Sequence, residues 1–350
     1  MSPALPRSGL RELEPYQAPQ LEVAVRLNTN ESPYPLPETF REELAGAVRG
    51  LELNRYPDRE ATDLREAIAK HAGHPVEGTW AANGSNEIIQ QLLLAYGGPD
   101  RTVTVFEPTY ALHERLSWVT HSEIMRLWLA EPWALGSNDV ERAIAGDPAV
   151  VFVCSPNNPT GNAQPLGTIE RLAAGAGALV IVDEAYGEFA GVSAAGLVAE
   201  HPNLVVVRTF SKAFALAGAR IGYCLASPEV VDDLRRVRLP YHLSALTQAA
   251  GLAALRHAGE ALAILDAIRS ERDRIFHALS AMPGVAAFPS DANFVLLRPP
   301  KPAGDVWRGL LDRGVLVRDM TSVVPGTLRV TAGTAEEVGS FLHALEEVLT

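Results

Sequence analysis

The sequence contains little cysteine, no long apolar run and no excess of positive charge. Its 350 residues include two cysteines, Cys154 and Cys224, and each lies in an apolar, strand-like stretch. We therefore predict two reduced core thiols and no disulfide. No apolar run approaches the roughly 20 residues of a membrane-spanning helix, and the N-terminal residues carry prolines and charges where a secretory signal would be apolar. These absences predict a cytoplasmic protein.

The charge balance argues against two further kinds of partner. The formal net charge is −12 at pH 7. Nucleic acids and anionic membranes are bound by clustered lysine and arginine, so neither is expected as a partner. The nine histidines are scattered, and the pair His71 and His74 has no carboxylate or thiol cluster beside it. No metal site is predicted, and any anionic ligand must be held by local positive groups.

The apolar pattern predicts an α/β fold. Turn-bounded apolar runs at 102–108, 149–156, 178–186, 203–212 and 219–226 are separated by helical stretches. Several runs are apolar on both faces, as strands are when helices cover both sides of a sheet. We therefore predict a large domain with a mostly parallel central sheet sandwiched by helices.

The rest of the chain predicts two further parts. Residues 1–29 are rich in proline and have little periodicity, which is typical of an extended arm. Helical character dominates from about 228 to 281, and short strands then alternate with helices, as in a smaller α+β lobe. We expect an N-terminal arm at 1–29 that packs on the small domain or a partner subunit, a large domain at 30–247 and a small domain at 248–350.

Polar residues follow the apolar runs at the places where ligands collect in an open parallel sheet, the carboxyl ends of the strands. A pyridoxal-phosphate enzyme needs a lysine, an acid for the pyridine nitrogen, a phosphate site and a stacking aromatic ring. Lys212 can supply the amine, since nearby positive charge and desolvation favour its neutral form. Asp183 can pair with the pyridine nitrogen, Tyr186 and Asn158 can bind the 3-hydroxyl, and Tyr110 can stack on the ring.

A phosphate site is predicted at the start of the helix near residue 85. Gly84 lets the backbone approach an anion, and Ser85 and Asn86 lie over the first free N–H groups of the helix. Three later residues can complete the cup: Thr209, Ser211 and Arg220.

Other ligand-binding motifs are absent from the sequence. Gly175 and Gly177 begin a GxG, but Val180 occupies the third glycine position and the segment precedes a strand, so no dinucleotide fingerprint is present. There is no phosphate-binding P-loop, no GxSxG and no zinc-ligand spacing. The residues alone thus predict a phosphate-bearing cofactor linked to a lysine.

Read in order, the motifs resemble those of the fold-type-I aminotransferases, and within that family the histidinol-phosphate aminotransferases. The resemblance covers nearly the whole chain. It includes Pro15–Tyr16, LNTNESPYP at 27–35, RYPD at 55–58, NGSNEI at 83–88, EPTY at 107–110, SPNNPTG at 155–161, DEAY at 183–186, TFSKAFALAGARIGY at 209–223 and LRVTAGT at 328–334.

The resemblance implies roles for these residues. Lys212 would be the Schiff-base lysine and catalytic base, with Asp183 and Tyr186 beside it. Tyr56 would reach the cofactor of a partner subunit, which implies a homodimer. The implied reaction is a two-stage transamination in which L-histidinol phosphate becomes imidazole-acetol phosphate and 2-oxoglutarate becomes glutamate. The implied substrate-binding residues are Arg329, Arg318, Tyr16 and Asn30.

Three alternatives remain open on the sequence. An aromatic-amino-acid aminotransferase would share the scaffold and turn over phenylalanine. A threonine-phosphate decarboxylase would share the phosphate-binding residues but release carbon dioxide. The third is a non-catalytic pyridoxal-phosphate-binding or interaction protein, against which the intact set of Lys212, Asp183, Tyr186 and Arg220 argues.

Overall fold

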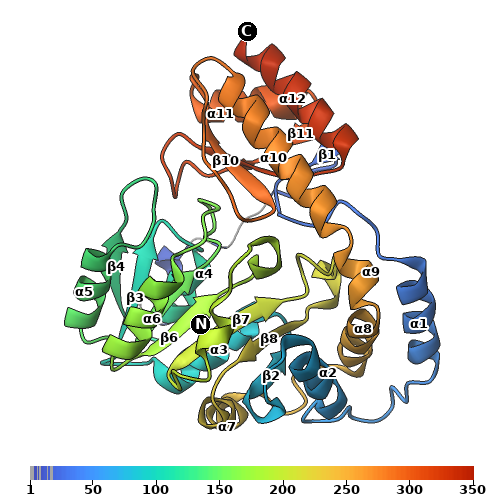
Figure 1. Ribbon diagram of the computed structural model, residues 1–350, viewed down its shortest axis with the longest axis vertical. Helices are drawn as coiled ribbons and strands as arrows, with labels where there is room; N and C mark the ends of the chain where they lie inside the picture. The colour runs from blue at the N-terminus through green and yellow to red at the C-terminus, as the bar shows by residue number, and fades with distance from the viewer. Residues whose placement is uncertain (1–3, 6, 8, 14, 16–18) are drawn as a thin grey trace.

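The computed structural model describes residues 4, 5, 7, 9–13, 15 and 19–350. A seven-stranded sheet forms the base of the molecule in Figure 1, and a smaller lobe carrying the C-terminus lies above it. The strand order in the large sheet is β2-β8-β7-β6-β5-β3-β4. Its strands are β2 (Thr79–Ala82), β3 (Thr102–Glu107), β4 (Glu123–Trp128), β5 (Val150–Cys154), β6 (Leu179–Asp183), β7 (Leu204–Thr209) and β8 (Gly222–Leu225).

Helices bury both faces of this sheet, which explains the continuous apolar runs. In β6, Leu179 and Ile181 belong to one hydrophobic cluster, whereas Val180 and Val182 belong to another. The first cluster includes residues of α3 and α7, and the second includes residues of α5 and α6. The helices of this region are α3 (Ser85–Tyr96), α4 (Leu112–Val119), α5 (Ser137–Ala145), α6 (Leu166–Gly175) and α7 (Pro228–Val237).

The predicted, mostly parallel sheet is confirmed. Strands β4, β3, β5, β6 and β7 are parallel, while β8 runs antiparallel to β7 and β2 antiparallel to β8. The apolar runs did not reveal β2 or β4. β2 has only four residues, and β4 is an edge strand whose side chains are mostly exposed or half-buried, so neither forms a long apolar run.

The smaller lobe contains a four-stranded antiparallel sheet of order β12-β13-β10-β9. A separate parallel pair joins β1 (Val25–Arg26) to β11 (Val315–Leu316), so the start of the chain is attached to this lobe. The predicted boundaries at 29/30 and 247/248 stay a prediction. The remaining elements are α8 (Ala245–Arg256), α9 (Ala258–Leu262), α10 (Leu265–Ala281), β9 (Ala286–Ala287), β10 (Phe294–Arg298), α11 (Ala303–Asp312), β12 (Arg318–Asp319), β13 (Leu328–Thr331) and α12 (Ala335–Leu349).

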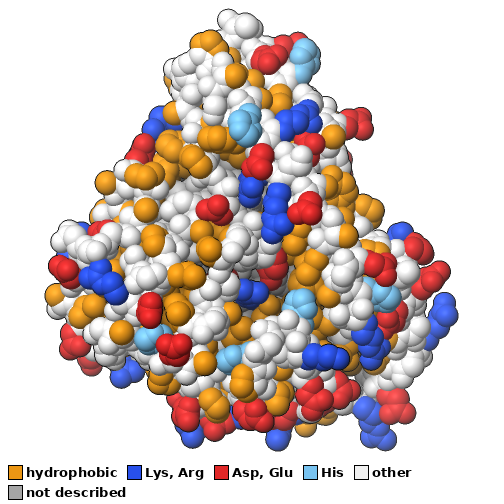
Figure 2. Space-filling view, viewed as in Figure 1, with side chains coloured by type: hydrophobic (Ala, Val, Ile, Leu, Met, Phe, Trp, Pro, Cys, Tyr) orange, Lys and Arg blue, Asp and Glu red, His pale blue; other side chains and the backbone are white. Residues whose placement is uncertain are grey.

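Two more helices, α1 (Glu38–Arg49) and α2 (Thr62–Ala72), pack against α8. Short 3₁₀ helices complete the described chain: η1 (Leu10–Glu12), η2 (Val76–Gly78), η3 (Gly187–Phe189), η4 (Ala194–Leu197) and η5 (Ala217–Ala219). On the face shown in Figure 2, acidic and basic side chains are interspersed, without a basic patch.

Cys154 and Cys224 are both buried and free, as predicted. Among the described residues, no helix combines the length and apolar character needed to cross a membrane. The same part of the chain holds no group of three or more His, Cys, Asp or Glu side chains that could bind a metal ion.

Candidate active site

A cavity of about 440 Å³ lies at the carboxyl ends of the parallel strands. β5, β6 and β7 end there at Cys154, Asp183 and Thr209, and residues of the 28–31 segment and of the smaller lobe complete the wall. The structure brings thirteen of the predicted site residues into this wall: Asn30, Ser85, Asn86, Tyr110, Asn158, Asp183, Tyr186, Thr209, Ser211, Lys212, Arg220, Arg318 and Arg329.

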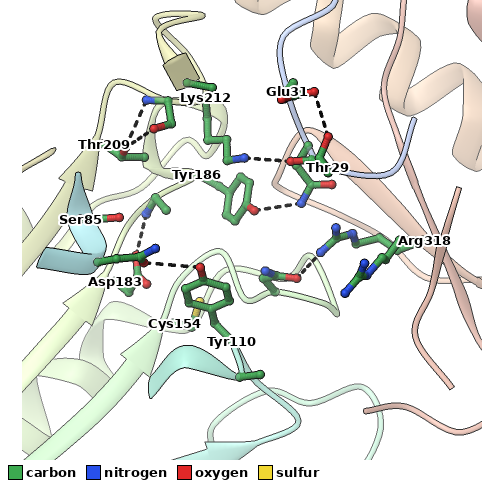
Figure 3. Close-up of a pocket in the computed structure, with 18 of the residues that line it drawn as sticks. Thr29, Glu31, Ser85, Tyr110, Cys154, Asp183, Tyr186, Thr209, Lys212 and Arg318 are labelled. Carbon is green, nitrogen blue, oxygen red and sulfur yellow. Dashed lines mark hydrogen bonds between the residues drawn. The ribbon is translucent and has the colours of Figure 1, made fainter. Parts of the chain in front are cut away.

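Lys212 projects from the loop after β7 into the cavity (Figure 3). Its Nζ donates a hydrogen bond of 3.0 Å to the carbonyl oxygen of Thr29. Burial, followed by the positive charges of Arg329 and Arg220, lowers the pKa of Lys212 to about 8, while Glu31 opposes this shift. A substantial fraction of the amine is therefore neutral near physiological pH, as a nucleophile requires.

Asp183 lies at the tip of β6, with only 2% of its surface exposed. Its Oδ1 accepts a hydrogen bond from the backbone N–H of Ala185, and its Oδ2 lies 3.0 Å from Nε2 of His113. The His113 ring is fully buried and stacks on Phe152, with ring centroids 4.6 Å apart. The Asp183 side chain is thus held in one orientation from behind while it lines the cavity.

Tyr186 is fixed by a residue of the N-terminal segment. Asn30 Nδ2 donates to the phenolic oxygen over 2.9 Å. Burial raises the pKa of Tyr186 to about 12, so the phenol keeps its own hydrogen available as a donor. Asn30 is held in turn by the Thr331 hydroxyl, which accepts from the Asn30 backbone N–H and donates to its side-chain oxygen. The contact links β13 of the smaller lobe to the strand tips of the sheet.

The predicted phosphate residues surround the N-terminus of α3. Arg220 Nη1 donates to the Ser211 hydroxyl at 3.4 Å. Gly84 precedes the helix with φ +89°, and a Cβ there would lie 2.6 Å from Arg220 Nη2. Gly84 does not line the cavity itself, but it leaves space for this arginine. The free N–H groups of a helix N-terminus and a guanidinium together suit a dianion.

The two predicted substrate arginines lie on neighbouring strands. Arg318 of β12 and Arg329 of β13 are directly opposite in the antiparallel register, so their side chains leave the same face of the sheet. Arg329 donates to the Asn158 side-chain oxygen and, at 3.0 Å, to the carbonyl oxygen of Asn28. In Figure 3, Arg318 lies on one side of Tyr186, and Ser85 and Thr209 lie on the other. The cavity therefore has two separate cationic regions.

The roles predicted for Tyr110, Tyr56 and Tyr16 are not shown by this cavity. The hydroxyl of Tyr110 donates to the Asn86 side-chain oxygen at 3.4 Å, and the ring makes an edge contact with His113, so its stacking role stays a prediction. Tyr56 does not line this cavity; it is 79% exposed and stacks on Tyr241. Tyr16 lies outside the described residues.

Comparison with known proteins identifies the family. The model of class I and II aminotransferases matches residues 22–345. The chain belongs to this family. It is 50% identical to a histidinol-phosphate aminotransferase of Frankia casuarinae, over 98% of this chain and 90% of the relative, and 48% identical to one of Thermobifida fusca, over 97% and 94%. The fold matches the crystal structure of histidinol-phosphate aminotransferase from Sinorhizobium meliloti in complex with pyridoxal-5'-phosphate, with a TM-score of 0.87 at 24% identity, covering 98% of this chain and 97% of that one.

The cavity of this aminotransferase fits pyridoxal phosphate, the cofactor on which the family depends. A cup formed by Ser85, Ser211 and Arg220 can hold the phosphate. A buried carboxyl group at Asp183 can face the pyridine nitrogen, and the amine of Lys212 lies in the same cavity. When bound, the cofactor supplies an electron sink for negative charge that develops at a substrate carbon.

Two residues that position this site were missing from the predicted set. His113 contacts the Asp183 carboxyl group and holds it in place. It comes three residues after Tyr110, at the start of the helix that follows β3, and this position was the signal that could have suggested it. Gly222 is the first residue of β8, and a glycine in an apolar strand marks close approach of another backbone. A Cβ at Gly222 would lie 2.3 Å from the backbone nitrogen of Ser85.

We expect Gly222→Ala to weaken cofactor binding by at least about tenfold, because the methyl group would displace the backbone at the start of α3. The measurement is the dissociation constant of pyridoxal phosphate by absorbance titration, with the melting temperature of the cofactor-free chain alongside. Gly177→Ala is the matched control, since a Cβ there meets nothing within 4 Å. Equal cofactor affinity in both variants would show that the approach of β8 to α3 does not shape the cup.

Proposed function

We propose that this aminotransferase transfers the amino group of L-histidinol phosphate to 2-oxoglutarate, giving imidazole-acetol phosphate and glutamate. The relatives that support this carry that name and are 48–50% identical over nearly the full chain. The observation that carries the proposal is the pair of Arg318 and Arg329 on one face of the small sheet, opposite the cofactor phosphate cup. Two guanidinium groups suit a phosphate dianion better than one.

Lys212, Asp183 and Tyr186 have different roles in the proposed reaction. With pyridoxal phosphate bound, the neutral amine of Lys212 would be the base that takes the proton from the substrate carbon, and its ammonium form would be the acid that returns a proton. Asp183 would keep the pyridine nitrogen protonated, and the contact of its Oδ2 with His113 holds the carboxyl group in one orientation. The Tyr186 hydroxyl would hold the cofactor's 3-oxygen by donating a hydrogen bond, while Asn30 holds the phenol in place.

In the second half-reaction, Arg329 holds a carboxylate of 2-oxoglutarate in place of the phosphate. Its hydrogen bonds to Asn158 and Asn28 fix the guanidinium before any substrate arrives. A fixed planar guanidinium can bind either anion by donating two parallel hydrogen bonds to it. Asn30 lines the same cavity, and the family resemblance adds Tyr16 as a proposed substrate-binding residue.

The test is a titration of the cofactor-loaded protein, followed by visible absorption. L-histidinol phosphate should convert the bound cofactor to its amino form at a far lower concentration than L-phenylalanine does. Addition of 2-oxoglutarate should then restore the original spectrum. A preference for phenylalanine would assign the protein to the aromatic aminotransferases, and release of carbon dioxide would assign it to the decarboxylases.

We further propose a homodimer in which Tyr56 reaches the partner's cofactor. Tyr56 is 79% exposed and stacks on Tyr241, and the exposed Leu53 and Leu239 belong to the same stretches of chain. Sedimentation equilibrium should give twice the chain mass of 37.6 kDa. Tyr56→Ala should weaken cofactor binding although Tyr56 lies outside the cavity of its own chain.

We also infer a cytoplasmic location, supported by the two free, buried cysteines.

A further inference from the structure

Three largely buried charged residues lie next to the ends of β6 and β7, and they have no role in the proposed reaction. Arg208 of β7 lies between the carboxyl groups of Glu184 and Glu188, and we call these three residues the Arg208 cluster. The Arg208 side chain is 16% exposed, and those of Glu184 and Glu188 are 2% and 8% exposed. Each member is a near neighbour in sequence of a residue that lines the cavity: Asp183 and Tyr186 on one segment, and Thr209 on the other.

Arg208 binds the chain on both sides of Tyr186. Its Nε and Nη2 donate to Oε2 of Glu184 at 3.0 and 2.8 Å, two residues before the tyrosine. Its Nη1 lies 3.9 Å from Oε1 of Glu188, two residues after it. The strand that leads to Lys212 is thereby attached to the turn that carries Tyr186.

Both carboxyl oxygens of Glu184 accept hydrogen bonds. Its Oε2 also accepts from the Ser193 hydroxyl at 2.8 Å, and its Oε1 accepts from the backbone N–H of Ala194. Arg208 Nη2 donates to the same hydroxyl at 2.7 Å. Buried charges cost free energy unless they are paired and hydrogen-bonded, so a fully bonded pair here holds one geometry.

Glu188 has a different environment. Among the described residues, neither of its carboxyl oxygens finds a hydrogen-bond partner, although both are buried. Burial raises the pKa of Glu188 to about 7, Arg208 opposes that shift and Glu184 adds to it. Tyr223, the partner of Arg208 in the β7–β8 register, faces the group from β8, and His71 lies within electrostatic range. The contact of Arg208 with Glu188 is thus weaker than its contact with Glu184.

We propose that Arg208 is a positioning residue for the reaction: with Glu184, and more weakly with Glu188, it fixes Asp183 and Tyr186 relative to the loop that carries Lys212. The residues of the cluster do not line the cavity, so they act through these three side chains. The role is the same for any amino donor, and it does not depend on the proposed substrate.

The test compares Arg208→Lys, Glu184→Gln and Glu188→Gln as cofactor-loaded proteins. The nitrogen that joins Lys212 to the bound cofactor can carry a proton, and a hydrogen bond from the Tyr186 hydroxyl to the cofactor's 3-oxygen favours the form without that proton. A displaced Tyr186 should therefore raise the pH at which half of the bound cofactor is deprotonated, which is read from the visible spectrum and called the spectral midpoint. We expect Arg208→Lys and Glu184→Gln to raise it by about half a pH unit or more, and to lower kcat by about tenfold with little change in KM. Glu188→Gln should give a smaller shift in the same direction.

Arg269→Gln is the matched control. Arg269 of α10 donates to the backbone carbonyls of Glu188 and Phe189, so it braces the same turn from a helix outside the Arg208 cluster. This variant should lower the melting temperature of the cofactor-free chain but leave the spectral midpoint unchanged. A midpoint that stays in place in Arg208→Lys and Glu184→Gln, or moves equally in Arg269→Gln, would overturn the proposal. If Arg208→Lys does not fold, the two glutamine variants decide the question.

Discussion

Replacing Lys212 with Ala is expected to lower turnover by more than about 10⁴-fold, since the change removes both the covalent attachment of the cofactor and the group that moves the proton. The amine donates a hydrogen bond to the carbonyl oxygen of Thr29, which is exchanged for water at small cost, so its loss should cost little stability. The phosphate cup of Ser85, Ser211 and Arg220 is unchanged by the substitution. The variant should therefore still fold and bind pyridoxal phosphate non-covalently.

The measurement for Lys212→Ala is single-turnover conversion with histidinol phosphate, together with cofactor affinity and melting temperature. Lys70→Ala and Lys301→Ala are controls, because these other two lysines of the chain are exposed and lie outside the cavity. Full activity in Lys212→Ala would remove the assignment of the catalytic amine. Loss of activity together with loss of the fold would mean that Lys212 is required for stability, contrary to what its hydrogen bond to Thr29 predicts.

Removal of Arg329 is expected to have the second-largest effect. Arg329→Gln should lower kcat/KM for both histidinol phosphate and 2-oxoglutarate by roughly 30-fold to 5000-fold, because removing one partner of a buried charge pair costs about 2–5 kcal/mol. Arg318→Gln should affect histidinol phosphate much more than 2-oxoglutarate, since only the phosphate needs both guanidinium groups. Cofactor affinity should change little in either variant.

A second readout separates substrate binding from structural support. Arg329 lowers the pKa of Lys212, so Arg329→Gln should raise that pKa above its value of about 8. The rate at which the cofactor-free protein takes up pyridoxal phosphate should then continue to climb at higher pH than in the unaltered protein. Equal losses of cofactor affinity and substrate capture would place Arg329 among the residues that merely hold the lobes together.

Much of this site could be predicted because its residues follow strands. Asp183, Tyr186 and Lys212 come directly after apolar runs, and parallel strands bring such positions to one edge of a sheet. The cavity also includes Arg318 and Arg329, whose direct pairing on β12 and β13 was not predicted. The family resemblance supplied their roles, and the register supplies the reason why both can face one anion.

What the sequence did not reveal depends on contacts between distant segments. The bond from His113 to Asp183 and the approach of Gly222 to Ser85 each join parts of the chain that no periodicity connects. The strand β4 was missed because an edge strand with exposed side chains is not an apolar run. The two carboxyl partners of Arg208, Glu184 and Glu188, become evident only when the turn around Tyr186 folds back onto β7.

The most direct test of the central claim is borohydride reduction of the cofactor-loaded protein, followed by peptide mass spectrometry. Reduction makes the bond between a lysine and pyridoxal phosphate permanent, and the chain has only Lys70, Lys212 and Lys301. The structure predicts one added phosphopyridoxyl group per chain, on the peptide that contains Lys212. A stoichiometric label on Lys70 or Lys301, with Lys212 unmodified, would contradict the assignment of this cavity as the active site.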